Sequence, residues 1–163
     1  MMSLSKRIPM LVLRLVALGA SVSAIVIMVS SHDSAQLFSM KFDAKYSHTP
    51  TFKYFVLVNG IASGYTFILL FFPSKSSCAH IILLLDLMMA LVLDSSISAC
   101  VAIGQVGKKG NSHAGWLPIC GQVPKFCDHV TGAIAAGFIA AIAYFLVLLY
   151  SLHNVMNLFA LRA

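Results

Sequence analysis

Two aspartates stand inside one long apolar stretch of the sequence, LLLDLMMALVLDSS, which covers Leu83–Ser96. The chain has only five acidic residues, all of them aspartate, and Asp86 and Asp94 are two of these five. Ionisable side chains are costly in hydrocarbon, and those found there usually form ion pairs, carry protons or bind ions. These two carboxyl groups are therefore the first candidates for chemistry in this chain.

Arg14 interrupts another apolar stretch near the start of the chain. If both stretches are helices that enter a membrane from the same side, Arg14 and Asp86 each lie about 9 Å below the same surface. We expect them to form an ion pair in which the guanidinium grips the carboxylate through two parallel hydrogen bonds. Three alternatives stay open: Arg14 extends toward lipid headgroups, Asp86 is protonated, or Asp86 cycles protons in transport.

Asp94 should lie deeper than Asp86, near the outer third of the bilayer, because about eight further residues separate the two. Asn59 belongs to an apolar stretch that runs in the opposite direction and reaches a similar depth. We therefore expect Asn59 to be the hydrogen-bond partner of Asp94. Alternatively, Asp94 bonds to Ser95, Ser98 or backbone carbonyls, or it is protonated.

Cys120 and Cys127 lie close together in a polar loop, where a disulfide is the natural interpretation if the loop faces an oxidising compartment. Such a bond would stabilise the loop by roughly 2–3 kcal/mol. The alternative is a metal site completed by His113 and His129, although the spacing matches no familiar zinc module. We expect Cys78 and Cys100 to be free thiols, because they lie in or near the apolar stretches, away from this loop.

The motifs of common enzymes are missing from the sequence. It contains no C-x-x-C redox motif, no glycine-rich phosphate loop and no Ser/His/Asp set with a defensible arrangement. No two histidines face each other in the middle of the apolar stretches, as the two ligands of a bound haem would. We therefore expect no enzyme activity, no cofactor and no metal.

Composition points to lipid as the surrounding solvent. Hydrophobic residues make up 60% of the 163 residues and charged residues only 10%. A soluble domain of this size carries far more charge. The net charge of +6 does not indicate nucleic-acid binding, because the basic residues are scattered singly or in pairs among loops and helix ends. We expect an all-α membrane protein.

Four stretches are long enough to cross roughly 30 Å of hydrocarbon, which takes about 20 helical residues. Each must satisfy its own backbone hydrogen bonds, so each should be a helix. The predicted spans are residues 8–29, 54–72, 81–106 and 130–152 of a single domain, 1–163. Residues 21–24 resemble a signal-peptide cleavage site, but the apolar run is too long and contains Arg14, so we expect the first stretch to be a span.

Lys6 and Arg7 precede the first span, whereas His32 and Asp33 follow it. Because the first helix usually sets the orientation, we expect both termini to be cytoplasmic. The two longer connections, residues 30–53 and 107–129, then face outward.

Small residues recur at spacings that let helices approach closely in lipid. The clearest step is Gly60-x-x-x-Gly64, and Gly137 belongs to a similar step with Ala133. Packing within one bundle and packing between protomers are both compatible with these steps.

The chain resembles the Casparian strip membrane domain protein-like (CASP-like) family of land plants, in particular its first subgroup, over nearly its whole length. The resemblance rests on Arg14 and Asp86, on AKYSHTPTFKYFVLVNGIASGY, and on GNSHAGWLPICGQVPKFC. Within the last segment the residues on the family pattern are Gly110, Trp116, Cys120, Phe126 and Cys127. The first outer loop lacks the acidic, aromatic signature of the true Casparian strip proteins.

The resemblance implies a four-helix plasma-membrane protein with a MARVEL-like layout, which forms homodimers and heterodimers with related members. It also implies a non-enzymatic scaffold that organises a membrane domain and positions cell-wall enzymes such as peroxidases. For Gly110, Trp116 and Phe126 we expect structural roles in the outer loop or contacts with a partner, although Trp116 could simply anchor at the membrane interface. The alternative function is a small transporter or channel component that uses Asp86 or Asp94.

Overall fold

Four long helices form the body of the protein in a computed structural model, which describes residues 4–37, 40–71 and 79–160. The helices are α1 (Leu4–Val29), α2 (Pro50–Phe71), α3 (Ala79–Lys109) and α4 (Pro124–Ala160). All four are long and apolar enough to cross a membrane, so the expected four-helix membrane fold is confirmed. The segment between the second and third predicted spans, including Cys78, lies largely outside the described residues.

All four helices begin before their predicted spans, and α3 and α4 also end beyond them. The 31 residues of α3 and the 37 residues of α4 give lengths of about 46 and 56 Å, more than the hydrocarbon layer requires. Helices α2 and α4 each begin at a proline, Pro50 and Pro124, whose fixed φ suits the first helical position. The fourth helix therefore starts earlier than the expected residue 130, and its first turn already contains Cys127.

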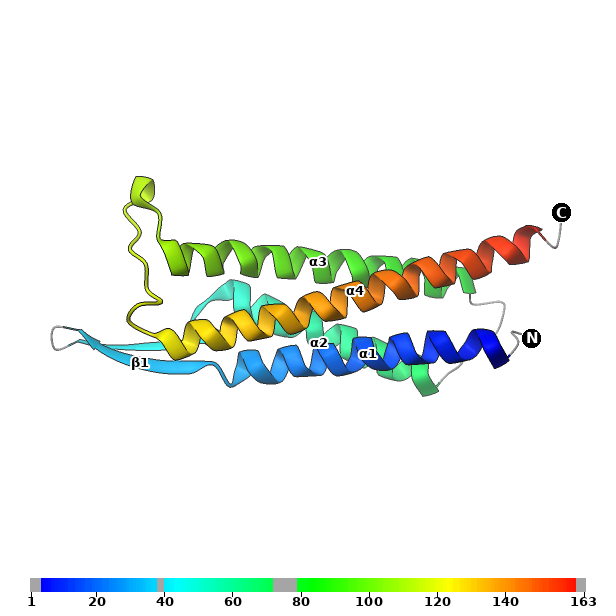
Figure 1. The fold of residues 1–163 in the computed structure, drawn as a ribbon, viewed down its shortest axis with the longest axis horizontal. Helices are drawn as coiled ribbons and strands as arrows, with labels where there is room; N and C mark the ends of the chain where they lie inside the picture. The colour runs from blue at the N-terminus through cyan, green and yellow to red at the C-terminus, as the bar shows by residue number, and fades with distance from the viewer. Residues whose placement is uncertain (1–3, 38–39, 72–78, 161–163) are drawn as a thin grey trace.

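The helices alternate in direction, and their order around the bundle follows the chain. Helix α1 packs against α2 and α4, and α3 also packs against α2 and α4. Helices α1 and α3 therefore lie diagonally opposite each other, as do α2 and α4. Figure 1 shows the first turn of α1 and the last turn of α4 at one end of the bundle, and the β-strands and the α3–α4 connection at the other.

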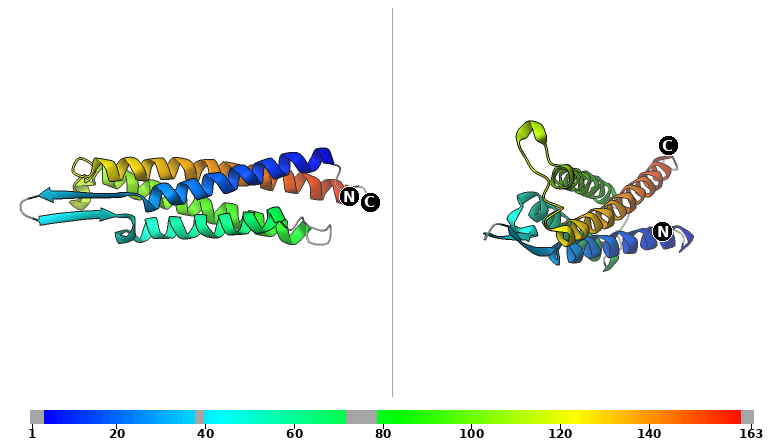
Figure 2. Two further views of the ribbon diagram at one scale, coloured as in Figure 1. Left: turned by 90° about the horizontal axis from the view of Figure 1, so that it is seen from below. Right: turned by 60° about the vertical axis from the view of Figure 1, so that its left-hand side comes forward.

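A two-stranded antiparallel sheet projects from the bundle where the sequence predicted only a polar loop. Strands β1 (His32–Leu37) and β2 (Met40–Lys45) pair in a register from His32 opposite Lys45 to Leu37 opposite Met40. Both views in Figure 2 show this hairpin reaching past the ends of the helices. The fold is thus all-α within the membrane, with one hairpin added outside it.

The inside of the bundle is filled mostly by small and medium apolar side chains. At the hairpin end, Phe55 and Ile97 pack close to Gly137, where an added Cβ would lie 2.9 Å from the Phe55 ring. Gly137 therefore allows α4 to approach α2 closely within the bundle. By contrast, a Cβ added at Gly60 or Gly64 would meet nothing within 4 Å. The Gly60-x-x-x-Gly64 step thus lies on the outside of the bundle.

Candidate functional site

Arg14 and Asp86 meet across the diagonal between α1 and α3. The Arg14 Nη2 atom donates to Asp86 Oδ2 over 2.8 Å. Arg14 is 7% exposed and Asp86 is fully buried. Separating the pair would leave a buried charge without its partner, which is costly, so the contact favours this relative position of the two helices.

The second oxygen of Asp86 is taken by a different residue from the one expected. Tyr65 of α2 donates its hydroxyl to Asp86 Oδ1 over 2.8 Å. The expected two-pronged arginine grip is therefore replaced by one bond from Arg14 and one from Tyr65. The Nη1 atom of Arg14 is buried and has no hydrogen-bond partner among the described residues.

The other diagonal of the bundle is also joined by hydroxyl groups. Tyr144 of α4 donates to the carbonyl of Ala62 on α2 over 2.6 Å, and the Thr66 hydroxyl bonds to the Tyr144 oxygen. Because Tyr144 has a single hydroxyl hydrogen and gives it to Ala62, Thr66 must be the donor in its own bond. Both side chains are almost completely buried.

Together these residues form a layer that touches all four helices. We call it the polar layer, and it consists of Arg14 on α1, Tyr65 and Thr66 on α2, Asp86 on α3 and Tyr144 on α4. Sequence reasoning identified the two charged members and missed the three hydroxyl-bearing ones. Tyrosine and threonine are common in membrane helices, so only their contacts distinguish these three.

The expected bond between Asn59 and Asp94 does not form, and that prediction was wrong. Asn59 is fully buried and donates Nδ2 to the Phe55 carbonyl of its own helix over 2.9 Å. Asp94 is exposed on α3. The pair was predicted from depth alone. Asp94 follows Asp86 by eight residues, and over eight residues the side-chain direction on an α-helix rotates by two full turns and about 80° more. Asp94 therefore points away from the interior that Asp86 faces.

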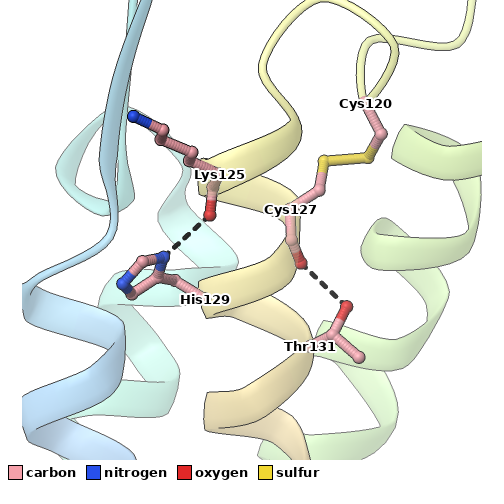
Figure 3. The surroundings of a disulfide bond; sticks show 5 residues. All are labelled: Cys120, Lys125, Cys127, His129 and Thr131. Carbon is pink, nitrogen blue, oxygen red and sulfur yellow. Dashed lines mark hydrogen bonds between the residues drawn. A yellow bond between two sulfur atoms is a disulfide. The ribbon is translucent and has the colours of Figure 1, made fainter.

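The α3–α4 connection is closed by a disulfide between Cys120 and Cys127, with Cα atoms 5.7 Å apart. Figure 3 shows this bond tying the connection to the first turns of α4, where Thr131 donates to the Cys127 carbonyl. The alternative metal site has no support, since the disulfide uses both sulfurs and the described residues contain no cluster of metal-ligating side chains. Cys100 is a buried free thiol.

Gly110 holds the turn that follows α3. Its φ is +68°, and an added Cβ would lie 2.5 Å from the Trp116 carbonyl oxygen. Asn111 and Trp116 then bond to each other through their backbones over 2.8 and 2.9 Å. Only glycine combines this left-handed backbone with such a close approach.

Trp116 of this connection and Phe126 of the first turn of α4 have different surroundings. Phe126 is 6% exposed and packs edge-to-face against Phe52 of α2, with ring centroids 6.0 Å apart. Trp116 is 57% exposed. Phe126 is thus part of the core at this end, whereas the Trp116 ring is open to an outside contact and is not a loop-core residue.

Comparison with known proteins identifies the family to which this chain belongs. A family model described as the Casparian strip membrane protein domain matches residues 3–143. The chain belongs to the CASP-like family of plant membrane proteins. CASP-like protein 1C1 of Vitis vinifera is 57% identical over 152 residues, which are 93% of this chain and 96% of that protein.

Other CASP-like relatives cover the chain almost end to end. CASP-like protein 1C1 of Arabidopsis thaliana is 51% identical over 162 residues, 99% of each chain. A CASP-like protein 1C2 of Populus trichocarpa is 58% identical over 145 residues, 89% of each chain. The resemblance to the first subgroup is thereby confirmed. No solved structure matches the chain.

Proposed function

We propose that this CASP-like protein is a non-enzymatic scaffold of the plasma membrane, which associates with itself and with related chains to organise a membrane domain. The observation that carries the proposal is the polar layer. Its ion pair has Asp86 bonded at both oxygens, and its hydroxyl groups join the second diagonal. These hydrogen bonds connect all four helices into one unit, as a subunit of a larger assembly requires.

The polar layer also argues for a scaffold over a transporter that uses Asp86. A carboxyl group that cycles protons must exchange its hydrogen-bond partners during each cycle. Asp86 is fully buried and held from α1 and α2 at once. Asp94, the other candidate of the transport hypothesis, lies on the outside of the bundle.

For the orientation, we place both termini in the cytoplasm and the hairpin end outside the cell. Two features support this choice. The disulfide belongs to the hairpin end, and disulfides persist in oxidising compartments. The basic pair Lys6 and Arg7 belongs to the opposite end, as the positive-inside rule expects for the first helix.

The outer end would then carry the contacts to cell-wall enzymes such as peroxidases. The hairpin projects beyond the helices, and the exposed ring of Trp116 stands on the α3–α4 connection at the same end. Tryptophan is enriched at protein interfaces because it combines a large apolar surface with a hydrogen-bond donor. Both features offer contacts that leave the membrane-embedded surface free for self-association.

The test is co-purification of two differently tagged copies expressed together in plant cells, after mild solubilisation of the plasma membrane. We expect each tag to recover the other, together with related CASP-like chains. Mixing the two detergent extracts only after solubilisation is the control for association in micelles. If each tag recovers only its own copy from the membranes of co-expressing cells, self-association is refuted.

A further inference from the structure

The lipid-facing surface of α3 carries polar side chains midway along the helix, where hydrocarbon is expected. Asp94, Ser95 and Ser98 are all exposed, and none of them has a hydrogen bond or ion pair with the described residues. Asp94 is the middle residue of the helix that spans Ala79–Lys109. A carboxyl group left alone in lipid at this depth is strongly disfavoured.

These side chains share one face of the helix. Positions 91, 94, 95, 98 and 102 lie within about 100° of arc when α3 is viewed down its axis. We call this surface the α3 outer face: Leu91, Asp94, Ser95, Ser98 and Ala102, all of them exposed. Ser98 and Ala102 are small residues four positions apart, a spacing that lets a second helix approach closely in lipid.

We propose that the α3 outer face pairs with the same face of a second copy of this chain, within the membrane. The inference rests on the proposed self-association and names the surface that produces it. In a pair related by a two-fold axis along the membrane normal, each Asp94 lies beside the partner's Asp94 and within a turn of the partner's Ser98. Asp94, Ser95 and Ser98 of each copy would then hydrogen-bond to the same three residues of the other copy.

A second copy fits this face because the face is complementary to itself. A neutral carboxyl group is both a donor and an acceptor, and so is a serine hydroxyl. Two such groups on neighbouring helices can therefore hydrogen-bond to each other. Arg14 of another copy cannot supply a cation to Asp94, because Arg14 is buried and already bound to Asp86.

The first measurement is cysteine crosslinking in plant membranes with a mild oxidant. Ser98→Cys is placed in a chain that carries Cys78→Ser and Cys100→Ala and keeps the Cys120–Cys127 disulfide. Ala135→Cys is the matched control, since Ala135 is exposed on α4 at a similar distance from the outer end of its helix. We expect a crosslinked dimer from Ser98→Cys and little from Ala135→Cys. Equal crosslinking of both, or none from Ser98→Cys, overturns the proposal.

The second measurement separates this pairing from other partners. In fluorescence energy transfer between labelled copies in vesicles, Asp94→Leu should weaken self-association about tenfold, the size of one or two interhelical hydrogen bonds. Asp94→Asn stays neutral and can donate and accept, so it should bind within about threefold of the wild type. If Asp94→Asn loses as much as Asp94→Leu, Asp94 faces a cationic partner, and the self-complementary pair is wrong.

Failure of this inference differs from failure of the proposed function. If wild-type copies co-purify while Ser98→Cys does not crosslink, the scaffold stands and the α3 outer face is not its interface. If wild-type copies do not associate at all, both proposals fall. Because Asp94 is exposed, Asp94→Leu should leave the bundle folded, and formation of the Cys120–Cys127 disulfide reports that fold.

Discussion

Asp86 is bonded from two helices at once, to Arg14 of α1 and to Tyr65 of α2, so its replacement should disturb contacts to both. Removing one member of a buried ion pair leaves the other uncompensated, at a cost of about 3–5 kcal/mol. We expect Asp86→Asn and Arg14→Leu each to lower the thermal unfolding temperature in detergent strongly. The double variant with Arg14→Leu and Asp86→Asn should cost less than the sum of the two single changes.

Asp94→Asn is the control for this prediction, because it alters a carboxyl group on the same helix that lies outside the bundle. It should unfold at nearly the wild-type temperature. Single variants of Arg14 and Asp86 that melt like the wild type would show that the pair does not hold the fold.

A second prediction compares alanine substitutions at Gly110 and Gly115. Gly110 and Gly115 share a positive φ, +68° and +70°, but only Gly110 has a carbonyl oxygen in the way of an added Cβ. Gly115→Ala should therefore cost only the backbone contribution, about 1–2 kcal/mol. Gly110→Ala should cost more, measured as faster protease cleavage of the α3–α4 connection. Equal sensitivity of the two variants would contradict the close approach at Gly110.

Among the elements, the hairpin of β1 and β2 should respond to pH through Asp43. The hydrogen bond from Lys45, whose Nζ is 2.8 Å from Asp43 Oδ2, lowers the pKa of this carboxyl below its usual value. A carboxyl with a lowered pKa stabilises the folded form above its ordinary pKa and loses that contribution as the pH falls through the lowered value. We expect the protection factors of the hairpin amides, corrected for the intrinsic exchange rate at each pH, to fall under acid conditions.

The pH effect on the hairpin should be small, because Asp43 is exposed to solvent. Asp43→Asn should reduce it, whereas Asp33→Asn, on the other strand, should leave it in place. An effect that persists unchanged in Asp43→Asn would assign it to another group.

The membrane helices could be predicted from the sequence because a run of about 20 apolar residues is typical of a helix that crosses the bilayer. The hairpin was missed because neither strand contains a β-branched residue, and only MKFDAK alternates between apolar and polar residues, whereas HDSAQL does not. The pairing of Arg14 with Asp86 followed from depth and opposite charge. The same depth argument failed for Asn59 and Asp94, because depth does not say which way a side chain faces around its helix.

At the scale of the whole molecule, polar groups divide between the inside and the outside of the bundle. The interior polar groups of the layer bond to one another, and Gly137 lets α4 approach Phe55. The outside carries large apolar side chains such as Leu57 and Leu91, and with them Gly60, Gly64 and the α3 outer face. A bundle with a locked interior can use its outer surface for assembly without loosening its own core.

Lateral mobility in the plant plasma membrane tests the scaffold most directly. The labelled protein is photobleached in a small area, and the recovery of fluorescence is compared with that of an unrelated four-helix membrane protein. We predict slow, incomplete recovery for the wild type and faster recovery for Arg14→Leu, since a loosened bundle should assemble poorly. Recovery of the wild type as fast as that of the unrelated protein would contradict a self-associating scaffold.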